Sequence, residues 1–157
     1  MLKTIIFLRH AKAEDAYLAE NDFKRKLTER GITDSEKMGQ YFTSLNIKPT
    51  IIYCSNSART MQTLELFNQK AQLTAEIVFN PKLYHALASE LLEYATSQTH
   101  QITMFVGHNM GISGVAHWLS ESGVKELPTC GLVVLQFENK IEMRKGKVIA
   151  YQVPKEI

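Results

Sequence analysis

Short, almost wholly apolar runs recur along this chain, and longer segments with helical spacing separate them. The first run, residues 3–8, is rich in β-branched side chains, which is typical of a central strand that is covered on both faces. Strands that alternate with helices predict an α/β fold, a three-layer α/β/α sandwich with a mostly parallel central sheet. The 157 residues fit one such domain, spanning residues 1–157, whereas two domains would be a tight fit.

The expected elements follow from hydrophobic spacing and from residues that start or stop helices. Strands are predicted at residues 3–8, 51–54, 76–79, 102–106, 132–137 and 148–153. Helices are predicted at residues 28–46, 58–70, 89–97 and, after a turn at 107–111, at 112–122. Thr28 is expected to cap the first helix, Ser89 to cap the third, and Gly123 to end the fourth.

The composition argues against several classes of protein. With 18 basic and 16 acidic side chains the net charge is +2, which disfavours a protein built to bind nucleic acid or an anionic membrane surface. Cys54 and Cys130 lie in apolar surroundings, so neither a disulfide framework nor a zinc finger is expected. No apolar stretch reaches the roughly 20 residues of a membrane span, and the N-terminal run is too short for a signal peptide. We therefore expect a cytoplasmic protein.

Arginine is scarce in this chain, with five residues against 13 lysines, so its placement carries information. Arg9-His10 directly follows the first predicted strand, Arg59 begins the helix after the second, and His108 follows the strand at 102–106. In parallel α/β sheets, ligands bind beyond the carboxyl ends of the strands. These side chains are therefore expected to converge on one site.

Arginine and histidine without a metal site fit phosphoryl transfer. Guanidinium groups match the negative charge that spreads over the three oxygens of a transferring phosphoryl group. A neutral imidazole can act as the nucleophile, and a second histidine can donate to the phosphoryl oxygens. No His pair has the spacing of a helical metal site, so no metal is expected.

Each of these signals has a simpler explanation when it is taken alone. An Arg-His pair occurs by chance, and a Gly-His turn can only cap a helix. The charged run at residues 24–26 is most simply a solvated surface, which leaves Arg25 weak by itself. The three remaining histidines are expected to be structural or exposed: His85, His100 and His117. The joint occurrence at strand ends is what favours a site.

Four short motifs occur in order along the chain. They read Leu8-Arg9-His10-Ala11, Arg25-Lys26-Leu27-Thr28-Glu29-Arg30-Gly31, Ser55-Asn56-Ser57-Ala58-Arg59-Thr60-Met61-Gln62-Thr63 and Val106-Gly107-His108-Asn109. Together they resemble the histidine phosphatase superfamily, which has the phosphoglycerate-mutase-like fold and an Arg-His-Gly hallmark. The short chain is similar to the SixA-like phosphohistidine phosphatase branch.

The resemblance implies a role for each matched residue. His10 would be the nucleophile that becomes phosphorylated, and water would hydrolyse this intermediate. Arg9, Arg25 and Arg59 would hold the phosphoryl group, and His108 would stabilise it from the opposite side. No metal or organic cofactor is implied. The expected substrate is a protein phosphorylated on histidine or a small phosphomonoester.

The sequence departs from the family pattern at three places. Ala11 replaces the usual glycine, and the asparagine found several residues later in many members is absent. No mutase-type glutamate follows residues 83–85, and Glu90, the nearest carboxylate, has a simple alternative role in the first turn of a helix. A missing acid favours phosphohistidine as substrate, because imidazole leaves more easily than an alkoxide.

Three other functions compete with this interpretation. A cysteine phosphatase would use Cys54 and Arg59, but their spacing is one residue short of the Cys-x5-Arg loop and the loop has no glycine. Cys54 is expected instead to be the buried last residue of a strand. A broad phosphomonoesterase and a non-enzymatic phosphate-binding module of the same fold remain open alternatives.

Overall fold

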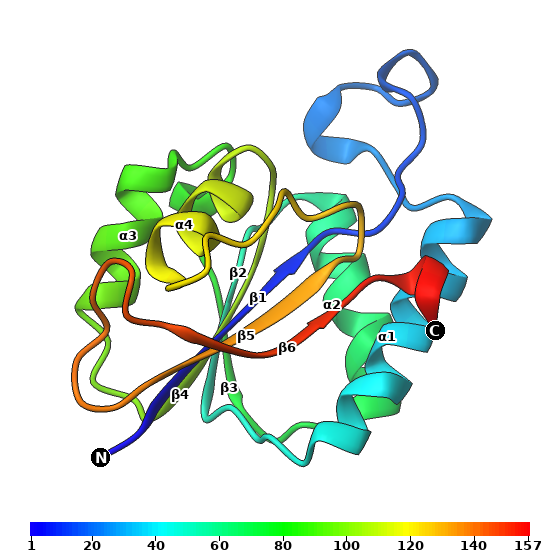
Figure 1. The fold of residues 1–157 in the computed structure, drawn as a ribbon. Helices are drawn as coiled ribbons and strands as arrows, with labels where there is room; N and C mark the ends of the chain where they lie inside the picture. Colours follow the sequence, from blue (N-terminus) through cyan, green and yellow to red (C-terminus); the bar gives the residue numbers. More distant parts are fainter.

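The computed structural model describes residues 1–157, and one six-stranded sheet forms its centre (Figure 1). In spatial order the strands run β3-β2-β4-β1-β5-β6. Their bounds are β1 Lys3–Arg9, β2 Ile51–Cys54, β3 Glu76–Phe79, β4 Ile102–Gly107, β5 Leu132–Phe137 and β6 Lys147–Gln152. The helices are α1 Glu29–Leu45, α2 Ala58–Ala71, α3 Ala88–Thr96 and α4 Gly111–Leu119. Four 3-10 turns complete the chain: η1 Ala16–Leu18, η2 Asp22–Lys24, η3 Pro81–Leu83 and η4 Pro154–Glu156.

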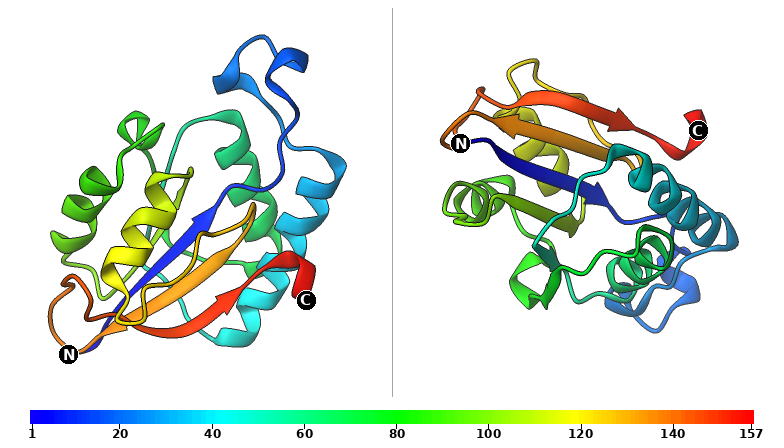
Figure 2. Two further views of the ribbon diagram at one scale, coloured as in Figure 1. Left: turned by 45° about the horizontal axis from the view of Figure 1, so that its top comes forward. Right: turned by 90° about the horizontal axis from the view of Figure 1, so that it is seen from below.

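The sheet is mostly parallel, as the sequence predicts. β1, β2, β3 and β4 pair in parallel, and β5 and β6 add an antiparallel edge. Helices α1 and α2 cover one face and α3 and α4 cover the other, which gives three layers (Figure 2). This confirms the predicted fold class.

The burial pattern of β1 explains why its sequence is apolar without alternation. Ile5 and Phe7 belong to the core cluster beneath α3 and α4, whereas Ile6 and Leu8 belong to the cluster beneath α1 and α2. Successive side chains of a strand point to opposite faces, so a strand between two helical layers must be apolar at every position. Both cores therefore depend on this one strand.

Two predicted helix ends are wrong. Ser89 does not cap α3: the helix begins at Ala88, and the Glu90 carboxylate accepts a hydrogen bond from the Leu87 N–H at 2.8 Å. α4 ends at Leu119 rather than at residue 122, because the chain turns extended at Ser120, which bridges to Gly146 in a parallel pairing. That pairing joins residues distant in sequence, so helical spacing alone does not reveal it.

The start of α1 is fixed against the segment that follows β1. Thr28 caps the helix as predicted, since its side chain accepts from the Gly31 N–H, and both its N–H and its hydroxyl donate to the Lys12 carbonyl. A Cβ on Gly31 would collide with that same carbonyl oxygen. The Leu-Thr-x-x-Gly motif thus holds a helix start close to the chain two residues after His10.

The segment between β1 and α1 projects beyond the ends of the strands (Figure 1). Its base is closed by a bridge between Ala13 and Leu27 and by the hydrogen bond from the Glu14 N–H to the Lys26 carbonyl. η2 lies on this arm and brings Asp22 back toward the sheet. None of the helices has the length and the apolar character that a membrane span requires.

Candidate active site

The ends of β1, β2 and β4 lie side by side and form the floor of a pocket. Arg9 is in register with Gly107, the His10 N–H donates to the Gly107 carbonyl, and the Ser55 N–H donates to the Val106 carbonyl. The pocket has a volume of about 300 Å³. Its lining consists of Arg9, His10, Lys12, Ala13, Asp22, Arg25, Arg59, His85, His108, Asn109 and Thr129. All five residues selected from the sequence therefore line one pocket.

His10 is held with its Nε2 unprotonated. Its Nδ1 lies 2.8 Å from the Ala11 carbonyl oxygen, which only accepts, so Nδ1 carries the proton. Nε2 in turn accepts from the Nε–H of Arg59 at 3.4 Å. Burial is the main cause that lowers the pKa of His10 to about 4, with smaller contributions from Arg59 and Arg9. The imidazole is therefore neutral at pH 7 and able to act as a nucleophile.

Arg59 is placed by the start of α2. Ser57 caps this helix by accepting from the Thr60 N–H, so Arg59 falls in the first turn, where its side chain is only 4% exposed. Its Nη1 donates to the carbonyl of Asp22 at 2.8 Å and its Nη2 to the Asp22 carboxylate at 3.2 Å. With both terminal nitrogens bound to one residue, Nε is left facing His10.

Two buried nitrogen atoms in the lining residues have no acceptor or donor within the protein. One is Nε of Arg9, whose Nη1 donates to the Leu127 carbonyl at 3.1 Å. The other is Nδ1 of His108, whose Nε2 lies 2.8 Å from the Ser55 hydroxyl. When Ser55 donates to Nε2, the proton of His108 resides on Nδ1. Buried polar groups are almost always paired, so these atoms suit a bound anion.

His108 shares the electrostatic environment of His10. Burial, followed by the charge of Arg59, lowers the pKa of His108 to about 3. The two imidazole rings lie 5.4 Å apart between their centroids, which leaves them on neighbouring sides of the pocket. A negatively charged ligand there would offset the guanidinium charges, which add to the effect of burial on both rings.

The contacts of Arg25 differ from those of the lysines beside it in the charged run at residues 24–26. Its Nε donates to the Glu14 carbonyl at 2.7 Å, and its Nη1 donates to the Asp22 carboxylate at 3.0 Å. Lys24 instead forms an exposed ion pair with Glu20. Only the arginine of this run, and not its lysine neighbours, lines the pocket.

Asp22 and His85 also line the pocket, and sequence reasoning misses both. His85, expected to be structural or exposed, is 60% exposed, and its Nε2 is 3.4 Å from Oδ2 of Asp22. Tyr84 donates its hydroxyl proton to the same carboxylate. Asp22 comes from the projecting arm and His85 from the turn before α3, so only the folded chain brings them together. The one sequence signal is that Asp22 lies three residues before Arg25.

The structure also places the residues at which the sequence departs from the family. Glu90 caps α3 and is not part of the pocket lining, which is the simple role expected of it. Ala11 is fully buried, donates its N–H to the Thr63 hydroxyl at 3.0 Å and packs in the core beneath α1 and α2. Its methyl group therefore takes no room from the pocket.

Cys54 lacks the surroundings of a nucleophilic thiol. It is fully buried at the end of β2, as expected, and it belongs to the core cluster rather than to the pocket. Burial raises the pKa of the Cys54 thiol to about 12. Since the thiolate is the reactive form, this environment argues against a cysteine phosphatase.

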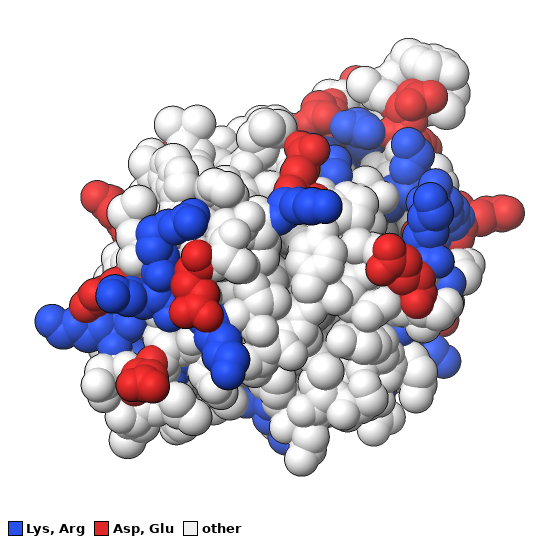
Figure 3. All heavy atoms as spheres, in the orientation of Figure 1, with Lys and Arg blue, Asp and Glu red and all other residues white.

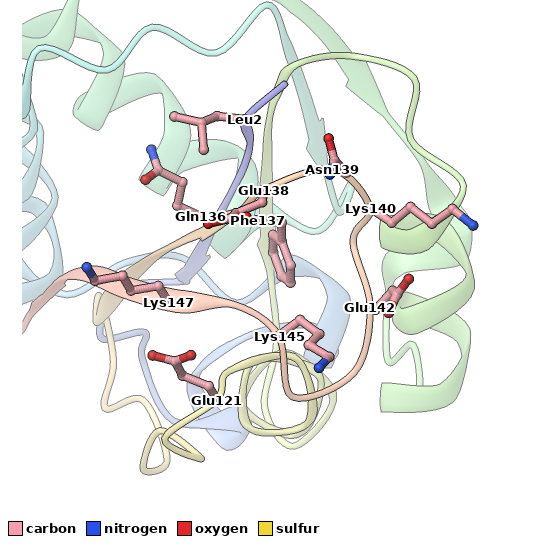
Figure 4. Close-up of a pocket in the computed structure, with 10 residues that line it drawn as sticks. All are labelled: Leu2, Glu121, Gln136, Phe137, Glu138, Asn139, Lys140, Glu142, Lys145 and Lys147. Atoms are coloured by element: carbon pink, nitrogen blue, oxygen red, sulfur yellow. The ribbon is translucent and has the colours of Figure 1, made fainter.

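A larger pocket of about 750 Å³ lies near the first residues of β1, at the end of the strand away from His10 (Figure 4). Lysine and glutamate side chains are mixed around it, among them Lys145, Glu121 and Glu142. It contains none of the motif residues and no histidine.

Comparison with known proteins gives three kinds of match. The family model of the histidine phosphatase superfamily (branch 1) matches residues 5–85. An uncharacterized chloroplastic protein of Arabidopsis thaliana is 30% identical over 146 residues, which are 85% of this chain and 66% of that protein. The chain thus spans slightly less than two thirds of the length of this relative.

Among solved structures, a candidate phosphohistidine phosphatase SixA from Agrobacterium tumefaciens is 27% identical, with a TM-score of 0.85 over 97% of this chain and 98% of that one. The protein histidine phosphatase SixA in complex with tungstate has a TM-score of 0.81 at 17% identity, covering 98% of both chains. The second likeness is one of fold.

Proposed function

The chain belongs to the histidine phosphatase superfamily, and on that premise we propose that it is a protein phosphohistidine phosphatase that works through a phospho-His10 intermediate. Phosphatase activity is supported by the family and by the SixA-like structures. The histidine nucleophile, the independence from metal and the choice of phosphohistidine are the proposal.

The observation that carries the proposal is the state of His10. Its Nδ1 proton is held by the Ala11 carbonyl, so the lone pair of Nε2 faces the pocket beside Nε of Arg59. In the first step this lone pair attacks phosphorus while the leaving group departs. In the second step water attacks phospho-His10 and releases phosphate, and neutral His10 is restored.

Four other lining residues stabilise the charge of the transferring group. Arg9, Arg25 and Arg59 supply guanidinium donors, and His108 supplies a ring N–H when Nδ1 is protonated. Such preorganised donors are worth more in a partly buried pocket than in water, because little solvent screens them. The fixed charges also remove the need for a metal ion.

Phosphohistidine is favoured as substrate by the acid groups of the pocket. Asp22 is the only carboxylate in the lining, and two arginines and a tyrosine bind it. Alkoxide leaving groups need a strong proton donor, whereas an imidazole leaves with less assistance. A pocket without a free carboxylic acid therefore suits cleavage of a P–N bond.

Two further expectations from the sequence, on nucleic-acid binding and on location, stay predictions. Charges of both signs are interspersed over the face shown in Figure 3, which accords with an absence of nucleic-acid binding. A cytoplasmic location is expected from the two free cysteines, both of which are buried.

The proposal is tested by incubating the protein with a histidine-phosphorylated protein and following the loss of its phosphoryl group by intact mass, together with free phosphate. Sugar phosphates and nucleotides are offered at equal concentration as alternative substrates, and the rate of phosphate release from each is compared. Faster turnover of phosphohistidine is expected. Faster turnover of the esters would identify a broad phosphomonoesterase, and no turnover of any substrate would identify a binding module.

A further inference from the structure

The leaving group of the proposed reaction needs a source of protons. Glu90 is engaged at the start of α3 and lies outside the pocket. Asp22 has its carboxylate bound by Arg25, Arg59 and Tyr84, and the Tyr84 and guanidinium hydrogen bonds hold the pKa of this carboxyl well below its usual range. It is therefore ionised at neutral pH and has no proton to give.

The two buried histidines are also unsuited to this role. His10 is the nucleophile, and burial keeps both His10 and His108 neutral, with pKa values of about 4 and about 3. A neutral imidazole can donate a hydrogen bond, but it is a very weak acid. His85 is the remaining histidine of the lining.

His85 is placed between the Asp22 carboxylate and the solvent. Its ring lies 4.0 Å from the ring of Tyr84 and 5.8 Å from that of His108, measured between centroids. Nε2 is 3.4 Å from Oδ2 of Asp22, while the side chain as a whole is 60% exposed.

The backbone of His85 is held in an uncommon conformation. Its φ is 59°, in the left-handed region that residues other than glycine rarely occupy. The turn between η3 and α3 imposes this conformation, which aims the side chain toward Asp22. Strained backbone of this kind is concentrated at functional sites.

We propose that His85, paired with Asp22, is the general acid and base of the reaction, and this inference rests on the proposed phosphohistidine phosphatase activity. A protonated His85 can keep one N–H on Asp22 and present the other to the leaving group. Donor and acceptor are then both imidazole rings, and imidazole is the side chain used most often in general acid–base catalysis. This pairing of two imidazole rings adds to the preference for phosphohistidine as substrate.

The protons balance over the two steps. As the bond between His10 Nε2 and phosphorus forms and the substrate P–N bond breaks, His85 gives its proton to the ring nitrogen of the substrate that is not bonded to phosphorus. The substrate leaves as a neutral imidazole. Neutral His85 then accepts a proton from the water that attacks phospho-His10, phosphate departs, and His85 is again protonated.

Several charged and titratable groups face His85. The Asp22 carboxylate on η2 binds Arg25 through Oδ1 and Arg59 through Oδ2, the oxygen that His85 also approaches. His108 after β4 is neutral, and the Tyr84 hydroxyl is turned to Asp22. The direct contact of the His85 ring is with the carboxylate.

The test compares wild type with H85G and H85N, because Gly and Asn both tolerate a positive φ and preserve the turn. H100N is the control, since His100 is a histidine on an exposed segment at the other end of β4. Initial rates are measured with phenyl phosphate and with p-nitrophenyl phosphate, whose leaving group needs far less protonation. Imidazole is then added to H85G acting on phenyl phosphate.

Both variants are expected to lose about 10²–10⁴-fold in rate with phenyl phosphate and less than about tenfold with p-nitrophenyl phosphate. Imidazole is expected to restore activity to H85G but not to change the H100N rate. Equal losses on the two esters, or no rescue by imidazole, would overturn the role of His85 while leaving the phosphatase activity of the wild type in place. A wild type that turns over none of these substrates would instead overturn the proposed function, and this proposal with it.

Discussion

Asp22 is the residue whose substitution tests the electrostatics of the pocket most sharply. Asp22→Asn keeps the shape of the side chain and removes its charge. In the wild type the carboxylate accepts from Nη1 of Arg25 at 3.0 Å and from Nη2 of Arg59 at 3.2 Å. Arg59 is only 4% exposed, so the substitution leaves a buried guanidinium without its counter-charge.

The expected loss of stability follows from these two contacts. Hydrogen bonds to charged groups each contribute about 1.5–3 kcal/mol. The Asp22 side chain is 38% exposed and Asn retains one acceptor oxygen, so solvent screening and the remaining bond reduce the total. We expect Asp22→Asn to lower the free energy of unfolding by about 2 kcal/mol at pH 7.

The same substitution predicts a dependence on pH. The pKa of Asp22 is lowered in the folded state by its Tyr84 and arginine partners. A carboxyl with a depressed pKa stabilises the fold above the pH at which unfolded aspartate titrates, about 3.9, and this contribution disappears as the pH falls further. The difference between wild type and variant should therefore be constant from pH 7 to about pH 5 and should narrow below about pH 4.

Urea denaturation followed by circular dichroism at several pH values measures this difference. Asp15→Asn is the matched control, because it removes the same charge from an exposed residue of the same arm that makes no capping hydrogen bond. The control should match the wild type. Equal stability of Asp22→Asn and wild type at pH 7, or a gap that persists unchanged at about pH 3, would refute the reasoning.

Three other predictions concern the fold, the nucleophile and the absence of a metal. Gly31→Ala should lower the free energy of unfolding by about 1–2 kcal/mol, because a collision with the Lys12 carbonyl outweighs a helix-propensity gain of at most about 1 kcal/mol. Urea denaturation measures this change, and a variant more stable than the wild type would contradict the prediction. Since the pKa of His10 is lowered to about 4, rapid-quench measurements should show that the rate of His10 phosphorylation does not fall between pH 7 and about pH 5. A decline in this rate with a midpoint near pH 6.5 would count against a neutral, buried nucleophile. Prolonged dialysis against EDTA should leave kcat/KM unchanged, because guanidinium groups supply the positive charge, and a loss that added metal restores would disprove this.

Much of the fold could be predicted from the sequence because the layers impose their own patterns. β1 is apolar from Ile5 to Leu8 since both of its faces are buried there, and α1 shows helical spacing since only one of its faces is buried. The ends of α3 and α4 could not be predicted in this way. α3 begins after Leu87, whose N–H donates to the Glu90 side chain. α4 ends before Ser120, which pairs with Gly146, a residue distant in sequence.

The residues of the candidate site also fall into a group that the sequence predicts and a group that it does not. Arg9, His10 and His108 could be predicted as neighbours because parallel strands end at one edge of the sheet. Asp22 and His85 could not, since each lies on a connection whose path depends on tertiary contacts. The sequence around them shows a charged run and a turn, and neither pattern indicates that the two side chains meet.

The most direct test of the central claim is the identity of the phosphorylated residue. The protein is mixed with a phosphohistidine substrate, quenched without acid within one turnover, and mapped by tandem mass spectrometry. We expect the phosphoryl group on His10 in the wild type and in Cys54→Ser, and no phosphoenzyme and no turnover in His10→Ala. A phosphoryl group on Cys54, or full activity in His10→Ala, would contradict the account.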